Sequence, residues 1–179
     1  MRLFVGGTRS GKSALAQQWA ERHASGSNAC LLYVATCRVE DGEMAARVAA
    51  HRAQRGPAWA VLEEAIDPLR ALNHLLATPH TIRAVVLDCV SLWLANLMAD
   101  GHGAPEIAKR VANLASGMQA CGLPCALVSA EVGMGLVPEN PVGRQFRDVL
   151  GEANQILARM CDTVIFATCG LPLTIKGQA

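Results

Sequence analysis

Short, nearly continuous apolar runs alternate along the chain with longer segments whose apolar residues recur at helical spacing. The runs predict strands buried on both faces of a parallel sheet, because a strand with one solvated face alternates apolar and polar residues. The longer segments predict helices that cover the sheet. The expected strands are residues 2–5, 30–35, 82–88, 124–130 and 162–167, and the expected helices are 12–24, 41–54, 68–77, 90–99, 105–121 and 142–160.

Local signals mark the ends of several of these elements. Asp67 before Pro68 predicts an N-cap followed by proline at the first helical position, and Ala104-Pro105-Glu106 opens another helix in a similar way. Residues 171–176 follow a glycine-containing turn and suit an antiparallel edge strand, where a proline is tolerated. The alternation of strands and helices therefore predicts one α/β domain over residues 1–179, with a mostly parallel central sheet.

A glycine-rich loop lies between the first expected strand and the first expected helix. Its pattern, Gly-x4-Gly-Lys-Ser, lets backbone N–H groups surround phosphate oxygens, and the helix N-terminus adds a partial positive charge. We expect Lys12 to neutralise the β and γ phosphates of a nucleotide and Ser13 to hold Mg²⁺. The alternative is a glycine turn that binds no ligand. The predicted nucleotide-binding loop comprises Gly6, Gly7, Thr8, Arg9, Ser10, Gly11, Lys12 and Ser13.

An acid ends the third expected strand, where four apolar residues precede Asp88. A carboxylate in this place is typical of the second motif of P-loop proteins, and it binds the metal ion or acts as a base. Alternatively, Asp88 caps the helix that follows it. Beside the phosphate loop, we expect Asp88 to be a catalytic and Mg²⁺-binding residue.

Two further segments carry candidate chemistry. Residues 41–54 place Glu43, Arg47 and His51 on one helical face, where a histidine is a surface residue or a catalytic group. Residues 131–141 are glycine-rich and follow the strand 124–130 at the functional edge of the sheet. The adjoining helix carries Arg144 and Arg147, which either clamp phosphate or are solvated.

Composition limits the class of partner. The formal net charge of +1 provides no electrostatic basis for nucleic acid or an anionic membrane as the main partner. No run of eighteen apolar residues occurs, so we expect no membrane span, and the first strand leaves no room for a signal peptide. Seven scattered cysteines without a CxxC pair favour a reducing cytoplasm.

The phosphate loop and several other stretches of the chain resemble the bifunctional adenosylcobinamide kinase / adenosylcobinamide-phosphate guanylyltransferase family of cobalamin biosynthesis. The resemblance implies a P-loop NTPase fold of the RecA-like kind, a corrinoid substrate and a homotrimer. It runs from Leu3 to Lys176 and is carried by the phosphate loop and by residues 33–36, 41–48, 88–97, 131–140, 146–148 and 154–155.

The resemblance also implies two reactions. ATP or GTP phosphorylates the hydroxyl of the cobinamide aminopropanol arm with Mg²⁺, and GMP then passes from GTP to that phosphate through a guanylylated histidine. The family's histidine follows Glu-Met-x-x-Arg, and His51 is the only histidine in that place. The implied catalytic residues are His51, Lys12 and Asp88, and the implied contacts of the guanine nucleotide are Ala35, Thr36, Cys37, Arg52, Ala53, Gln54, Arg55, Glu63 and Asp88.

Two other functions compete with this one. The first is a small-molecule kinase with a single activity, in which His51 is incidental. The second is a RecA-like motor or switch acting on nucleic acid or protein, which the near-neutral charge and the lack of a basic stripe disfavour.

Overall fold

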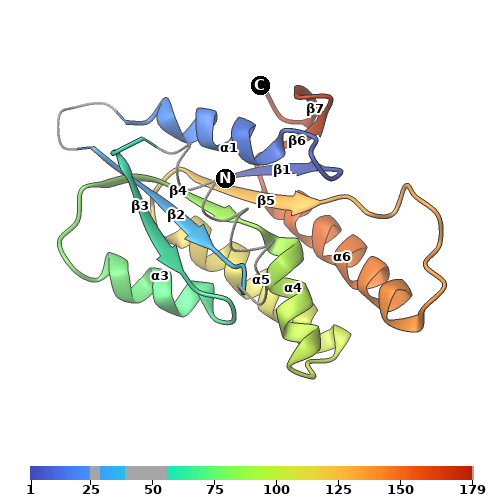
Figure 1. The fold of residues 1–179 in the computed structure, drawn as a ribbon. Coiled ribbons are helices and arrows are strands. Elements are labelled where there is room, and N and C mark those ends of the chain that lie inside the picture. The colour runs from blue at the N-terminus through green and yellow to red at the C-terminus, as the bar shows by residue number, and fades with distance from the viewer. Residues whose placement is uncertain (25–28, 39–55, 179) are drawn as a thin grey trace.

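The computed structural model describes residues 1–24, 29–38 and 56–178. Within them the strands form one sheet in the order β3-β2-β4-β5-β1-β6-β7, and β7 alone among these runs antiparallel to its neighbour (Figure 1). The strands are β1 (Arg2–Gly6), β2 (Cys30–Ala35), β3 (Trp59–Glu63), β4 (Ile82–Asp88), β5 (Cys125–Ala130), β6 (Thr163–Thr168) and β7 (Leu171–Lys176). The helices are α1 (Lys12–Glu21), α3 (Pro68–Leu76), α4 (Val90–Ala99), α5 (Ala104–Ala120) and α6 (Pro141–Met160).

Helices cover both faces of the sheet, with α1 on one face and α3 to α6 on the other (Figure 1). Successive residues of β1 therefore enter different cores. Phe4 packs with Trp19 of α1, whereas Leu3 and Val5 pack with residues of α4, α5 and α6. All three β1 side chains are buried, which explains why the strand is continuously apolar in the sequence.

The predicted α/β class and the antiparallel edge strand are confirmed. Asp67 caps α3 by accepting a hydrogen bond from the backbone N–H of Arg70, and Pro68 is the first residue of that helix. Most boundaries agree within one residue, although α1 ends at Glu21 and residues 22–24 form a turn instead of continuing the helix. The expected helix 41–54 lies outside the described residues.

The strand β3 was not predicted. It pairs only with β2 and forms one edge of the sheet, so much of its surface is solvated, and Val61 is 41% exposed. Its residues 59–62 are nevertheless continuously apolar, so the sequence carried the signal by which the buried strands were identified. The described helices include none that is long and apolar enough to cross a bilayer.

A pair of cysteines at the junction of α5 and β5 gives a prediction about thiol reactivity. The Sγ atoms of Cys121 and Cys125 are 3.5 Å apart, and the hydrogen bond between them lowers the pKa of Cys121 to about 6. We expect the alkylation rate of Cys121 by iodoacetamide to rise through pH 6 and then level off, because the thiolate is the nucleophile. Peptide mass spectrometry between pH 5 and 9 measures this rate.

Cys89 provides the internal comparison, since burial raises the pKa of its thiol to about 11 and keeps it protonated over this range. Cys125→Ala removes the hydrogen bond and should move the Cys121 profile towards the ordinary thiol range near pH 8.5. A wild-type Cys121 rate that rises only above pH 8 contradicts the expectation.

Candidate active site

The register of the parallel strands brings several predicted site residues to one edge of the sheet. Ala35 at the end of β2 is paired with Glu63 at the end of β3 and with Asp88 at the end of β4. Gly6 at the end of β1 is paired with Ala130 at the end of β5. The carboxyl edge of an open parallel sheet is where such folds bind ligands, so these residues share a candidate site.

The phosphate loop depends on glycine at two positions. Gly11 has a φ of 91°, a left-handed conformation that favours glycine, and a Cβ there would lie 3.0 Å from the Cα of Gly170. A Cβ on Gly6 would collide with the carbonyl oxygen of Ala167 and with Oγ of Ser10. The loop is thus packed tightly against β6 and the turn that follows it.

Neighbouring backbone fixes both ends of this loop. The N–H of Glu131 donates to the carbonyl of Gly6 over 3.1 Å, and the N–H of Gly170 donates to the carbonyl of Ser10 over 3.0 Å. Gly11 is the N-cap of α1 and supplies no capping side chain, so the first-turn N–H groups have no side-chain acceptor at the cap. An anion placed there is stabilised by these donors and by the helix dipole.

Polar side chains complete the loop. Nζ of Lys12 donates to the carbonyl of Gly7 over 3.0 Å, so its ammonium group folds back across the loop. Oγ of Ser10 is buried and has no hydrogen-bond partner among the described residues. Ser13 lies in the first turn of α1, beside Lys12. Cationic and hydroxyl donors thus gather where the backbone can surround a phosphate.

Asp88 faces the site instead of capping the next helix. Its Oδ2 accepts a hydrogen bond from Oη of Tyr33 over 2.8 Å. The N-cap of α4 is Cys89, whose Sγ accepts from the N–H of Leu92. The alternative in which Asp88 caps α4 is therefore wrong, because the thiol of the next residue performs this task.

Electrostatics at Cys89 place Lys12 and Asp88 in the same neighbourhood. Burial and the Asp88 carboxylate raise the pKa of the Cys89 thiol, whereas the ammonium group of Lys12 acts in the opposite direction. Both charges act on one buried thiol, so the ammonium group and the carboxylate lie around the same point of the sheet edge.

Thr36 and Asn96 fix the position of the Asp88–Cys89 junction. The fully buried Oγ1 of Thr36 donates to the carbonyl of Cys89 over 2.7 Å and accepts from its N–H over 3.0 Å. Nδ2 of Asn96 donates to the carbonyls of Thr36 and Ala65. These bonds join the end of β2 to the end of β4 and to the segment after β3. Cys37 directly follows Thr36 in the chain and so lies beside this junction.

Thr36→Val is expected to destabilise the protein by about 1–3 kcal/mol, because the substitution keeps the shape and leaves two buried backbone groups of Cys89 without their side-chain partner. Denaturant unfolding measures this change. Thr78→Val is the matched control, since Thr78 is exposed and its hydroxyl donates only to a carbonyl in its own turn. Equal stability of the Thr36→Val and Thr78→Val variants contradicts the role given to Thr36.

Side chains of α6 hold the glycine-rich loop that follows β5. Nδ2 of Asn154 donates to the carbonyl of Ala130, and Nη2 of Arg147 donates to the carbonyl of Gly133. Arg144 donates to the carbonyls of residues 138 and 139. Both arginines therefore bind loop carbonyls in this structure, so they are more than solvated side chains, and their contact with a phosphate stays a prediction.

Three residues of the site were not expected from the residue pattern, namely Tyr33, Asn96 and Asn154. Each acts through a bond to a residue 24 to 60 positions away in the chain. Tyr33 carries a usable signal, since it is a polar-tipped aromatic residue in a buried strand and requires a partner. The predicted residues His51, Arg52, Ala53, Gln54 and Arg55 lie outside the described residues.

Comparisons with known proteins agree with this arrangement. The family model described as cobinamide kinase / cobinamide phosphate guanyltransferase matches residues 2–175. The bifunctional adenosylcobalamin biosynthesis protein CobP of Pseudomonas aeruginosa is 38% identical, covering 98% of this chain and 97% of its own. The protein CobU of Escherichia coli, which has the same description, is 35% identical and covers 98% and 99%.

A solved structure shares the fold. The KaiC-like protein of the archaeon Pyrococcus horikoshii superposes with a TM-score of 0.55 over 92% of this chain and 69% of its own, at 15% identity. At this identity the likeness shows the fold alone, and it agrees with the predicted mostly parallel sheet flanked by helices.

Proposed function

Since the chain belongs to the cobinamide kinase / cobinamide phosphate guanyltransferase family, we propose that this enzyme first phosphorylates adenosylcobinamide with ATP or GTP. It then transfers GMP from GTP to the new phosphate through a guanylylated His51. The observation that carries the proposal is the meeting of the phosphate loop, Lys12 and Asp88 at one sheet edge, within a chain that matches this family over nearly its whole length.

In the kinase step, the acceptor hydroxyl oxygen forms a bond to the γ phosphorus and the bond to the β–γ bridging oxygen breaks. Lys12 neutralises charge that develops on the β and γ phosphates, and the N–H groups of the loop bind their oxygens. Oγ of Ser13 and the carboxylate of Asp88 would hold Mg²⁺, which supplies further charge neutralisation. Two oxygen donors fit this ion, because Mg²⁺ takes its remaining ligands from phosphate and water.

In the guanylyl step, an imidazole nitrogen of His51 forms a bond to the α phosphorus of GTP and pyrophosphate departs. A phosphate oxygen of cobinamide phosphate then displaces the imidazole, which gives the GDP derivative and free histidine. Arg52 and Arg55 stabilise the charge on the departing group. The remaining proposed nucleotide contacts are Ala35, Thr36, Cys37, Ala53, Gln54 and Glu63.

Incubation with GTP labelled in its α phosphate tests the covalent step. We expect a protein-bound label that is acid-labile and alkali-stable, as a phosphoramidate is, and that is absent in His51→Ala. His74→Ala is the control, because His74 lies on α3 away from the phosphate loop. A kinase that forms cobinamide phosphate without acquiring the label is the single-activity enzyme, and that result overturns the histidine intermediate.

The proposal includes assembly and location. A homotrimer follows from the family resemblance, and the exposed apolar side chains of β7 at Leu171, Leu173 and Ile175 support burial against another copy. Light scattering coupled to size exclusion gives the oligomeric state, and a monomeric mass contradicts the trimer. The cytoplasm is proposed because the seven cysteines, all of which the structure describes, form no disulfide bond.

A further inference from the structure

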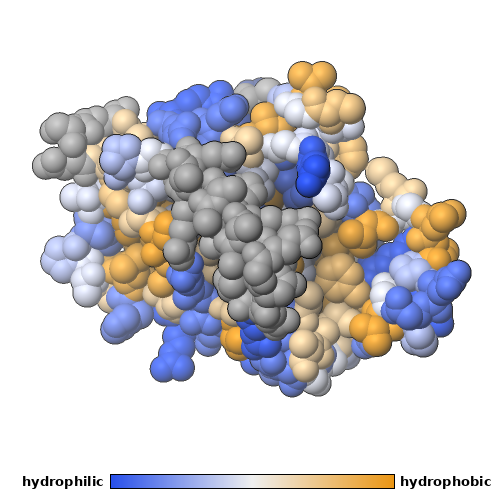
Figure 2. Space-filling model, in the orientation of Figure 1, coloured by the Kyte–Doolittle hydropathy of each residue, from blue (hydrophilic) through white to orange (hydrophobic). Residues whose placement is uncertain are grey.

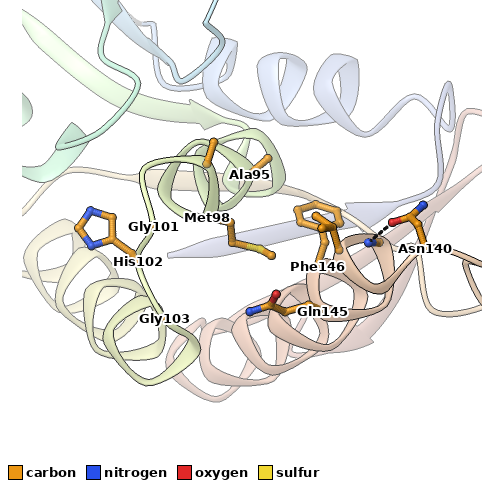
Figure 3. A pocket seen from close by; sticks show the side chains of 11 residues that line it. Ala95, Met98, Gly101, His102, Gly103, Asn140, Gln145 and Phe146 are labelled. Carbon is orange, nitrogen blue, oxygen red and sulfur yellow. Dashed lines mark hydrogen bonds between the residues drawn. The ribbon is translucent and has the colours of Figure 1, made fainter.

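A cavity of about 660 Å³ opens between α4 and the start of α6 (Figure 3). Its apolar wall is formed by Ala95 and Met98 of α4 and by Val142 and Phe146 of α6. Polar side chains lie at three places: His102 on the loop between α4 and α5, Asn140 directly before α6, and Gln145 on α6. An apolar cavity with a few polar groups is the usual form of a small-molecule site.

Several interactions hold the rim of the cavity in place. Oδ1 of Asn140 accepts from the N–H of Gly143 at the start of α6, and Nδ1 of His102 lies 2.8 Å from Oε1 of Glu106. Arg38 forms two hydrogen bonds to the carboxylate of Asp100, directly before the loop that carries His102. These bonds within the protein preorganise the rim, which lowers the cost of binding a ligand.

The position of the cavity along α4 gives its distance from the proposed nucleotide site. Helix α4 begins at Val90, directly after Asp88 and Cys89, and rises about 1.5 Å per residue. Ala95 and Met98 thus lie about 8 and 12 Å along the helix from Val90. The other wall begins at the end of the loop 131–140, whose first residue is bonded to the phosphate loop. A ligand here must reach the γ phosphate through an extended arm.

We propose that this cavity binds part of the corrin ring of the acceptor, while the aminopropanol arm extends along α4 to Lys12 and Asp88. The inference rests on the proposed function. A corrinoid has this form: its reacting hydroxyl ends a flexible amide-linked arm several bonds from the ring. The ring presents apolar surface to Met98 and Phe146, and its peripheral amides suit His102 and Gln145.

The surface beside the cavity extends this apolar wall. The loop after β5, whose carbonyls accept hydrogen bonds from arginines of α6, carries three exposed apolar side chains. These are Met134, Leu136 and Val137, which are 80%, 97% and 65% exposed. Figure 2 shows apolar residues gathered on the side of the molecule where α4, α6 and this loop lie. A macrocycle larger than the cavity can lie on this surface while one edge of its ring enters the cavity.

Ala99→Trp tests the proposal by filling the cavity from an exposed position, which spares the core. Equilibrium dialysis against cobinamide, read by its visible absorbance, measures corrinoid binding. We expect at least a tenfold weaker affinity for cobinamide and an unchanged affinity for a fluorescent GTP analogue. Val142→Trp, which fills the cavity from α6, should act in the same way. Ala120→Trp is the matched control on an exposed alanine of α5, away from the cavity.

Cobinamide affinity within threefold of wild type in both filled variants overturns the cavity as the corrinoid site. So does a changed oligomeric mass in both variants with corrinoid binding retained, because a second copy is then the occupant. Wild-type protein that binds the GTP analogue but no cobinamide contradicts the proposed function itself, and this result is distinct from the first two.

Discussion

Lys12→Ala is expected to lower the kinase turnover by about 10³-fold, the largest effect of any substitution among the described residues. The ammonium group of Lys12 lies across the phosphate loop, where it donates to the carbonyl of Gly7. Its loss removes the ammonium group that neutralises the charge developing on the β and γ phosphates. Initial rates of cobinamide phosphate formation measure the change at saturating nucleotide.

Lys109→Ala is the control, because Lys109 is exposed on α5 and far from the phosphate loop in the chain. We expect its rate to equal that of wild type. Lys12→Ala should also retain the wild-type circular dichroism spectrum, since the ammonium group supports one loop hydrogen bond and no part of the core. Turnover of Lys12→Ala within tenfold of wild type contradicts the role of Lys12.

Asp88→Asn is expected to reduce kinase turnover by about 10²- to 10³-fold, because the amide removes the negative charge proposed to hold Mg²⁺ while the side-chain shape is kept. Tyr33→Phe separates charge from orientation. It removes the hydrogen bond to Oδ2 of Asp88 and leaves the carboxylate. The lost bond is made to a carboxylate and is worth about 1.5 kcal/mol, so we expect a rate loss of about tenfold.

Rates for the two variants, measured over a range of Mg²⁺ concentrations, distinguish these effects. Asp88→Asn should require more Mg²⁺ for half-maximal rate than wild type, whereas Tyr33→Phe should require a similar concentration. If the two variants lose the same share of kinase turnover, a direct role of the carboxylate is contradicted. Both substitutions would then act by disturbing the junction between β4 and α4.

The buried strands and the phosphate loop are predictable from sequence because local physics determines them. Residues 82–88 are apolar on both faces, and the glycines at positions 6 and 11 occupy places that exclude a Cβ. The edge strand β3 has the same length as β1 and is apolar over residues 59–62, so its sequence carried a usable signal that the prediction missed.

The supporting contacts of the site depend on the assembled sheet. Tyr33 reaches Asp88 only because β2 and β4 are neighbours, although the two residues are 55 positions apart. Arg147 donates to the carbonyl of Gly133, a contact that spacing along the chain does not reveal. Cys89 replaces Asp88 as the cap of α4, which follows from the path of the chain after β4 and not from residue preference.

The most direct test of the two-step reaction is mass spectrometry of the product formed from adenosylcobinamide, GTP and Mg²⁺ by the wild-type protein. We predict a corrinoid whose mass has increased by one phosphate and one GMP unit, preceded in time by the phosphorylated form. A product that stops at the phosphorylated form contradicts the guanylyltransferase step, and an unchanged corrinoid contradicts both reactions.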